Sequence, residues 1–173
     1  MIVTSVSRPE LLDRDGSDRD FRHMVYDLLT VCVRMQEVRD RLAAEMEVSG
    51  PQYGLLMAIF HLQDEIGGAG VGAVARQLHV SGPFVTAQAN RLVVLGLVEK
   101  RPNPDDGRGV LLCLTGDGMQ RIAQSLPVIQ RANDAFFGSV DRLHFVALSD
   151  LAASLEKSSG QAVRVLKELS DPG

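Results

Sequence analysis

Residues 103–115 read NPDDGRGVLLCLT, and the interpretation of the whole chain depends on this stretch. Proline, asparagine, aspartate and glycine concentrate in its first half, which is typical of a tight turn. Five apolar residues, 110–114, follow the turn, and residues 97–101 form a second short β-type run before it. Two such runs around a turn of this composition predict a β-hairpin.

Two carboxylates and the guanidinium of Arg108 share this turn, which leaves several kinds of site open at first. A calcium loop of the EF type is disfavoured, because positions that need oxygen ligands hold Gly109 and Leu111. An arginine at a hairpin tip projects beyond the protein body, where a narrow A·T-rich minor groove would attract its charge. Asp106 can accept N–H groups of Arg108 and limit its rotamers. The turn is therefore interpreted as a support for a DNA-facing arginine.

The residues before the hairpin predict two short helices, 71–78 and 83–95, joined by a three-residue turn at 80–82. Ser81 is placed to cap the second helix, and Pro83 is tolerated in its first turn. The pair forms a helix–turn–helix. Taken alone, this motif is a DNA-binding unit in some proteins and a structural corner in others.

The side chains of the second helix separate into a buried stripe and an outer face. Val85, Ala89 and Leu92 recur at helical spacing and mark the stripe. The outer face then carries small polar groups, a methyl and one guanidinium, on Thr86, Ala87, Asn90 and Arg91. Such groups suit contacts with phosphates and base edges in a major groove. A single basic residue leaves a merely solvated face as the alternative.

Amphipathic helices flank this central segment. Residues 20–46 predict a long helix whose heptad-like apolar stripe needs another helix against it. The stripe comprises Phe21, Met24, Leu28, Val31, Met35, Val38 and Leu42. A second helix, 52–62, follows Ser49 as N-cap and Pro51 in the first turn.

Two further helices follow the hairpin. Thr115 is placed to cap a fifth helix, with a kink expected near Pro127. The last helix covers residues 141–169, and Gly160 is a candidate interruption. Residues 1–17 are charged and aperiodic and are expected to form a loose tail.

The glycine-rich stretch GAGVGA, residues 68–73, matches a dinucleotide-binding fingerprint and opens a helix. The context differs, because an amphipathic helix precedes it in place of a buried strand, and no acidic residue lies about 20 positions further on. Residues 67–72 are therefore expected to be a flexible connector.

Composition excludes several classes of protein. The 173 residues carry a net charge of −4, yet residues 71–109 hold five basic and three acidic residues and form a mildly positive island. No apolar run approaches 18 residues, so no membrane partner is expected. Cys32 and Cys113 show no metal spacing and are interpreted as small buried hydrophobes. The four scattered histidines and the lack of a nucleophile motif predict no metal, cofactor or catalytic site.

Residues 106–115 fit the D-x-R-x-x-x-L-x-L-T signature of the MarR (multiple-antibiotic-resistance repressor) family at every fixed position, and residues 92–101 resemble its recognition-helix end and first wing strand. The element order is similar from about residue 20 to residue 155. The resemblance implies a mainly α fold with a small β-wing: a winged helix–turn–helix domain plus N- and C-terminal dimerisation helices. It implies a homodimeric repressor that binds palindromic double-stranded DNA and is released by a small molecule. The lack of a disulfide framework and of an apolar N-terminal segment predicts a cytoplasmic protein.

The expected domains are a tail (1–17), an N-terminal dimerisation helix (18–48), the winged helix–turn–helix domain (49–115) and C-terminal dimerisation helices (116–173). The expected DNA-binding residues are Ser81, Thr86, Ala87, Asn90, Arg91, Lys100, Arg101, Asp106 and Arg108. Lys100 and Arg101 are assigned to phosphates. Candidate effector-binding residues are His23, Tyr26, Arg34, Tyr53 and His61. Arg34 is a candidate partner for a carboxylate, which suggests an aromatic acid or its thioester as effector.

Two alternatives stay open. Ala87 and Gly107 lie where members of the family often carry a basic residue, so a winged protein-interaction module without DNA binding is the first. A redox-sensing regulator is the second, and it would depend on Cys32.

Overall fold

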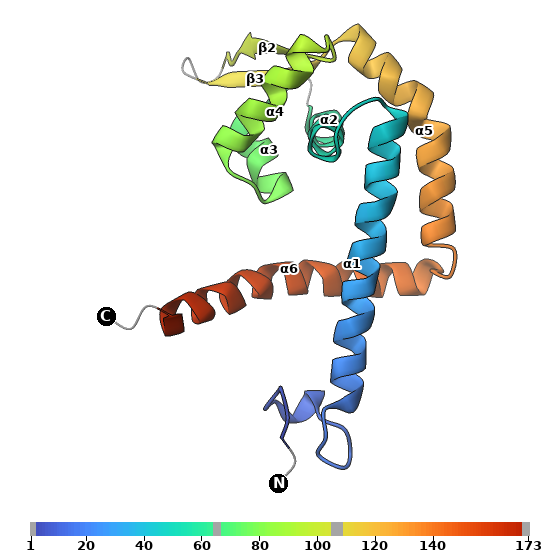
Figure 1. Ribbon diagram of the computed structural model, residues 1–173, viewed down its shortest axis with the longest axis vertical. Helices are drawn as coiled ribbons and strands as arrows, with labels where there is room; N and C mark the ends of the chain where they lie inside the picture. Colours follow the sequence, from blue (N-terminus) through green and yellow to red (C-terminus); the bar gives the residue numbers. More distant parts are fainter. Residues whose placement is uncertain (1–2, 64–66, 105–108, 171–173) are drawn as a thin grey trace. The chain divides into compact units, whose positions relative to one another are not determined.

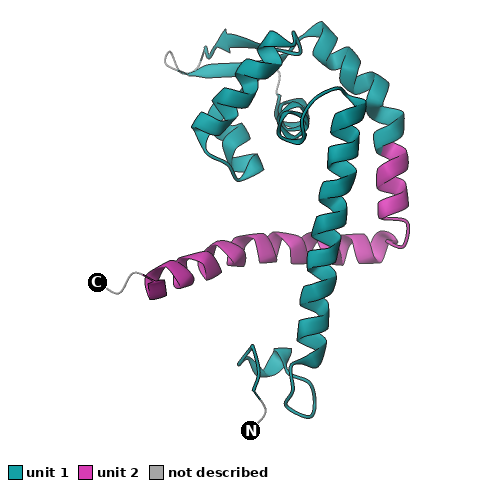
Figure 2. Ribbon diagram, viewed as in Figure 1, with its two compact units in different colours: residues 1–129 teal, residues 130–173 magenta. Residues whose placement is uncertain are grey.

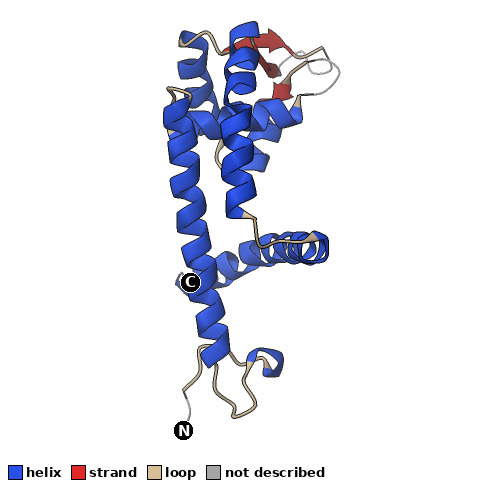
Figure 3. Cartoon of the chain, turned by 90° about the vertical axis from the view of Figure 1, so that its right-hand side faces the viewer, coloured by secondary structure: helices blue, strands red, loops and turns tan. Residues whose placement is uncertain are grey.

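The computed structural model describes residues 3–63, 67–104 and 109–170. The chain divides into two compact units, Met1–Ile129 and Gln130–Gly173, which are described separately (Figure 2). Figure 3 shows that helices dominate, with the strands confined to one small sheet. The fold class is therefore mainly α with a β-wing, as the sequence predicts.

The first unit contains the winged helix–turn–helix (Figure 1). Its elements are η1 (Pro9–Leu11), α1 (Arg19–Glu45), α2 (Gly50–Leu62), β1 (Ala69–Gly70), α3 (Val71–Leu78), α4 (Gly82–Val94), β2 (Val98–Pro102), β3 (Val110–Leu114) and most of α5 (Gly116–Phe136). The second unit contains the end of α5 and the whole of α6 (Arg142–Ser170).

Local sequence signals set the start of α2 and both ends of α4. Ser49 and Gln52 form a reciprocal capping box at the start of α2, and the hydroxyl of Ser81 accepts from Phe84 N at 3.3 Å at the start of α4. Gly96 follows α4 with φ of 73°, a left-handed conformation that costs glycine little. The predicted caps and helix stop are therefore confirmed.

The sheet is antiparallel with the strand order β1-β3-β2. The predicted hairpin pairs Val98 with Leu114 and Lys100 with Leu112. The segment expected as a flexible connector is instead partly a strand, because Ala69 pairs with Leu112 on the other edge of β3. A Cβ on the preceding Gly68 would lie 2.7 Å from Cys113 Sγ, so glycine allows the close approach of this segment to β3.

The core of the first unit forms around α2. Six residues of this helix are buried, and Leu56 and Ile59 are fully so, because α1, α3, α4 and β3 all pack against it. A helix covered on several sides needs apolar residues around its whole circumference, which explains why α2 lacks a polar face. Arg121 of α5 donates to the carbonyl oxygen of Met46 at 2.7 Å, joining α5 to the end of α1.

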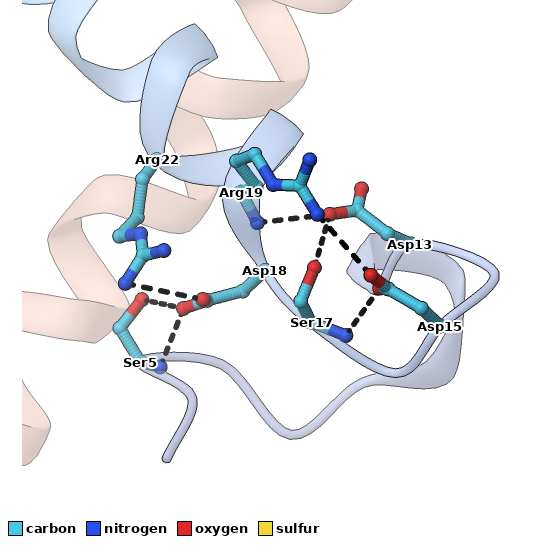
Figure 4. A network of polar contacts seen from close by, with 7 residues as sticks. All are labelled: Ser5, Asp13, Asp15, Ser17, Asp18, Arg19 and Arg22. Atoms are coloured by element: carbon cyan, nitrogen blue, oxygen red, sulfur yellow. Dashed lines mark hydrogen bonds and ion pairs between the residues drawn. The ribbon is translucent and has the colours of Figure 1, made fainter. Parts of the chain in front are cut away.

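The N-terminal segment is attached to the start of α1, which differs from the loose tail that its composition predicts (Figure 4). The carboxylate of Asp18, 1% exposed, accepts from both the backbone N–H of Ser5 at 2.6 Å and its hydroxyl at 2.5 Å. Asp13 accepts from the Ser17 hydroxyl at 2.7 Å and from the backbone N–H of Arg19 at 2.9 Å. These hydrogen bonds hold the pKa of Asp13 and of Asp18 below the ordinary aspartate value.

Both long terminal helices expose apolar faces. On α1 the stripe residues Met24, Leu28 and Val31 are between 42% and 45% exposed, whereas Leu42 near its end is buried against the core. Every described residue of α6 is exposed, and Gly160, the candidate interruption, lies within the continuous helix. Pro127 lies inside α5, which continues through it.

Candidate nucleic-acid interface

Helix α4 is fixed to the core by the stripe that the sequence predicts. Val85, Ala89 and Leu92 are fully buried. The helix packs against α2, α3 and β2, so its direction is set on three sides (Figure 1). A helix held in this way presents its opposite face at a defined angle, as a recognition helix requires.

That opposite face is exposed along its length. Thr86, Ala87, Asn90 and Arg91 are all solvent-accessible, as the spacing predicts. Phe84, which sequence reasoning missed, is 39% exposed in the first turn, and Val94 at the other end is 87% exposed. Phenylalanine, alanine and the threonine methyl are suited to contact with thymine methyl groups. The signal that could have identified Phe84 was its place in the first turn, outside the buried stripe.

Ser81 lies at the N-terminus of this face, and its side chain is already used as the helix cap. The hydroxyl oxygen accepts from Phe84 N, which leaves its O–H hydrogen as a donor. A serine in this position can donate to a phosphate while it continues to cap the helix.

Gln88 is a second residue that sequence reasoning missed. It lies on the core side of α4, is 7% exposed, and its Oε1 has no hydrogen-bond partner among the described residues. Its neighbour in the sequence, Ala87, faces solvent, so the helix carries a polar side chain inward and an apolar one outward at this point.

The wing, formed by β2 and β3, contributes one side chain directly to the exposed face of α4. Lys100 Nζ donates to Asn90 Oδ1 at 2.6 Å, joining β2 to the middle of the recognition helix. Both side chains are exposed, so the pair is accessible to a ligand. The sequence predicts both residues as DNA-binding but gives no sign that they contact each other.

Arg101, the other basic residue of β2, has an acidic partner in the same strand. Its Nε donates to Glu99 Oε1 at 2.8 Å, and its Nη2 contacts the same oxygen. The bond with Glu99 raises the pKa of Arg101, so the guanidinium stays charged, with part of its charge compensated. Asp106 and Arg108, the predicted tip of the wing, lie outside the described residues.

Hydrogen bonds of Thr115 join the base of the wing to the turn after α4 and to the first turn of α5. Thr115 Oγ1 donates to the carbonyl oxygen of Gly96 at 2.6 Å and accepts from Gly118 N at 3.0 Å. The backbone N–H of Thr115 also donates to Leu97 O at 3.2 Å. The predicted helix cap at Thr115 is therefore confirmed, and the same residue also fixes the end of the wing next to the turn after α4.

The candidate effector residues are not brought together in the structure. His23 and Tyr26 line a surface cavity of about 330 Å³ on α1 with Arg19, Arg22 and Asp27. Tyr53 is instead a core residue, whose ring lies 5.9 Å from the guanidinium carbon of Arg39. Burial raises the pKa of Tyr53.

The other two candidates also have partners of their own. Arg34 pairs with Glu37 at 2.8 Å, so the guanidinium proposed for a ligand carboxylate already has a carboxylate beside it. The ring of His61 lies edge-on to that of Phe60, with centroids 5.3 Å apart.

The two cysteines differ. Cys113 is fully buried, as expected, and burial raises the pKa of its thiol, which disfavours the reactive thiolate. The prediction for Cys32 is wrong in the single chain, where this residue is exposed because the first part of α1 extends away from the core. Within residues 3–63, 67–104 and 109–170 there is no cluster of three metal-ligating side chains. None of the helices among these residues is long and apolar enough to cross a membrane.

Comparisons with known proteins match this domain. Residues 47–109 match the model of the MarR family. An HTH-type transcriptional regulator of Bacillus subtilis, YdcH, is 39% identical over 44 residues, which cover 25% of this chain and 30% of YdcH. The alignment thus spans less than a third of that relative.

Solved structures share the fold over most of the chain. A cysteine-to-serine mutant of E. coli MarR in complex with operator DNA has a TM-score of 0.64 at 20% identity, covering 79% of this chain and 95% of MarR. BpsR of Bordetella bronchiseptica, whose DNA binding is regulated by 6-hydroxynicotinic acid, has a TM-score of 0.62 at 19% identity over 78% of this chain and 98% of BpsR. The MarR family model thus matches the segment that contains the winged helix–turn–helix, and the fold shared with these solved structures extends well beyond that segment.

Proposed function

We propose that this protein is a cytoplasmic, sequence-specific DNA-binding regulator that acts as a homodimeric repressor. The observation that carries the proposal is the geometry of α4. Its buried stripe of Val85, Ala89 and Leu92 leaves an exposed opposite face, and a wing lysine is hydrogen-bonded to that face. The solved complex of MarR with operator DNA, which shares the fold, supports this assignment.

In the proposed complex, α4 enters the major groove and the wing follows the adjacent backbone. The residues assigned to the major groove are Ser81, Thr86, Ala87, Asn90 and Arg91. Lys100 and Arg101 supply positive charge beside the phosphates. Arg108, held by Asp106, is assigned to the minor groove on the sequence pattern alone.

The dimer is proposed from the apolar faces of the terminal helices. A stripe of four half-exposed residues on α1, and a longer one on α6, would be costly to leave in water in a single chain. A second copy of the chain would cover them and place two α4 helices related by two-fold symmetry. Such a dimer binds a palindrome with half-sites about one helical turn apart.

The proposed effector is a small aromatic carboxylate or its thioester. The cavity beside His23 and Tyr26 combines an aromatic ring with two guanidinium groups, from Arg19 and Arg22. That BpsR responds to 6-hydroxynicotinic acid, an aromatic acid, supports the same chemical class. Calorimetry against a panel of aromatic acids and their thioesters tests the assignment, and absence of heat across the panel would refute it.

DNA binding is tested by titrating the protein with the DNA upstream of its own gene at two salt concentrations. We expect a shift that weakens as salt rises, because each phosphate contact releases counterions. Arg108→Ala should lower the affinity by roughly tenfold at fixed salt while the protein remains dimeric. Unchanged affinity of this variant would remove Arg108 from the interface without affecting the rest of the proposal.

A protein-interaction module without DNA binding is the second candidate function. Two observations favour it: Ala87 places a methyl at the centre of the outer face, and Glu99 compensates part of the charge of Arg101. No shift with upstream DNA at low salt would favour the module. A redox switch at the exposed Cys32 is the third candidate, and Cys32→Ser should then retain DNA binding and lose any response to peroxide.

A further inference from the structure

The hydrogen bond between Lys100 and Asn90 changes which base edges the recognition helix α4 can contact. We infer that these two residues form one donor unit that selects guanine over adenine at a single position of the operator. The inference rests on the proposed DNA-binding function and assigns Lys100 to a base edge, where the sequence pattern had indicated a phosphate. It makes the wing strand a determinant of specificity as well as of affinity.

The sheet register explains how a wing residue reaches the recognition helix. Side chains alternate between the two faces along a strand, so Val98 and Lys100 lie on one face of β2, and Glu99 and Arg101 lie on the other. Val98 is buried and Lys100 contacts Asn90 of α4, so their face is the one directed toward α4. The ammonium group is thereby carried to the middle of the reading face.

The chemistry of the contact fixes which amide atom is used. A lysine ammonium only donates hydrogen bonds, so the atom that faces it must be the carbonyl oxygen of Asn90 and not its nitrogen. The amide NH₂ of Asn90 and two remaining N–H groups of Lys100 are then available outward. The Lys100–Asn90 pair therefore presents mainly hydrogen-bond donors, together with the full positive charge of the ammonium group.

This arrangement disfavours the usual contact between asparagine and adenine. That contact needs Oδ1 to accept from the adenine amino group while the amide donates to N7. Here Oδ1 already accepts from Lys100, and the ammonium repels a second donor that approaches it. Guanine presents N7 and O6, two acceptors, which match the remaining donors of the pair.

Arg101 provides a matched control within the same strand. It is the residue next to Lys100 and carries the same charge, but it lies on the opposite face of β2 and is bonded to Glu99. Removing either charge lowers the positive potential near DNA similarly. Only removal of Lys100 frees Oδ1 of Asn90.

The experiment selects duplexes from a randomised pool with the wild type, Lys100→Met, Arg101→Met and Asn90→Ala, followed by titration of single-base-pair variants of the selected sequence. Methionine keeps an apolar stem without a donor, and all three sites are exposed, so folding should be preserved; circular dichroism checks this. The position that Asn90→Ala relaxes identifies the base pair read by Asn90.

We expect the wild type to prefer guanine over adenine at that position by roughly tenfold. Lys100→Met should remove or reverse this preference, because the freed Oδ1 can then accept from adenine. Arg101→Met should weaken binding to all sequences alike and keep the preference for guanine.

Two other results would overturn the inference in distinguishable ways. If the wild type selects a sequence, and Lys100→Met and Arg101→Met weaken binding equally without changing the preferred base, Lys100 is a phosphate contact and the inference is wrong. If the wild type selects no sequence and shows no salt-dependent binding, the proposed function itself fails, and the inference fails with it.

Discussion

Gly118, in the first turn of α5, packs against the backbone at the base of the wing, and this packing requires a residue without a side chain. A Cβ at this residue would lie 2.1 Å from the carbonyl oxygen of Leu97, a backbone atom that cannot rotate away. The close approach allows Thr115 to hydrogen-bond to both Gly96 and Gly118. The fixed position of the wing beside α4 therefore depends on this glycine.

Gly118→Ala should destabilise the protein by roughly 1–3 kcal/mol, because α5 must move away from Leu97 to admit the methyl group. Chemical denaturation with urea measures the change. Gly116→Ala is the matched control, since its Cβ would meet nothing within 4 Å in the same turn. The control should be neutral or slightly stabilising, and equal losses for the two variants would contradict the explanation.

At the scale of elements, the N-terminal segment is joined to α1 through carboxylates. Asp18 is held by both donors of Ser5, and Arg22 contributes an ion pair at 3.5 Å from the next helical turn. These hydrogen bonds lower the pKa of Asp18, the Ser5 hydroxyl contributing most. The attachment of this segment should therefore depend on pH.

The sign follows from the lowered pKa. A carboxyl group whose folded pKa lies below its unfolded value of 3.8 contributes stability above that pH, and the contribution is lost as pH falls through the folded pKa. We expect the amide resonance of Ser5 to keep its hydrogen-bonded shift down to pH 3.8 and to change below it. NMR titration measures this, and Asp18→Asn should remove the titration. A midpoint above 3.8 in the wild type would contradict the assignment.

In the helix–turn–helix and its wing, the local features follow from the sequence, whereas a pairing between distant segments does not. The capping residues Ser49, Ser81 and Thr115 were predicted because each cap depends on residues within a few positions of it. The two-residue strand β1 was missed, because its pairing with β3 joins residues more than 40 positions apart. The sequence pattern indicates flexibility at Gly68. In the structure, the lack of a side chain at Gly68 allows its backbone to lie close to Cys113.

At the scale of the whole molecule, the two units leave most of their apolar helix faces uncovered when each is considered by itself. The heptad-like stripe of α1 is partly exposed from Met24 to Met35, and α6 exposes apolar residues from Leu143 to Leu169. These faces are the basis of the proposed homodimer.

Leu28→Glu should weaken the dimer by at least roughly 100-fold, because each of the two copies would lose a buried leucine and gain a charge. Sedimentation over a range of protein concentrations measures the monomer–dimer equilibrium. Thr30→Glu places the same charge on the opposite side of α1 and should leave the dimer intact. If both variants remain dimeric, α1 is not part of the interface.

The sequence by itself determined the order of the helices, their caps, the hairpin and the buried stripe of α4, because these features depend on periodicity and on contacts between near neighbours. It also indicated the family, since the residues of the signature are contiguous. Only the tertiary structure decided that Lys100 reaches Asn90, that Gly118 must lack a side chain, and that Ser5 is held by Asp18. Each of these contacts joins separate elements, and its geometry is fixed by the packing and register of those elements, which no local pattern encodes.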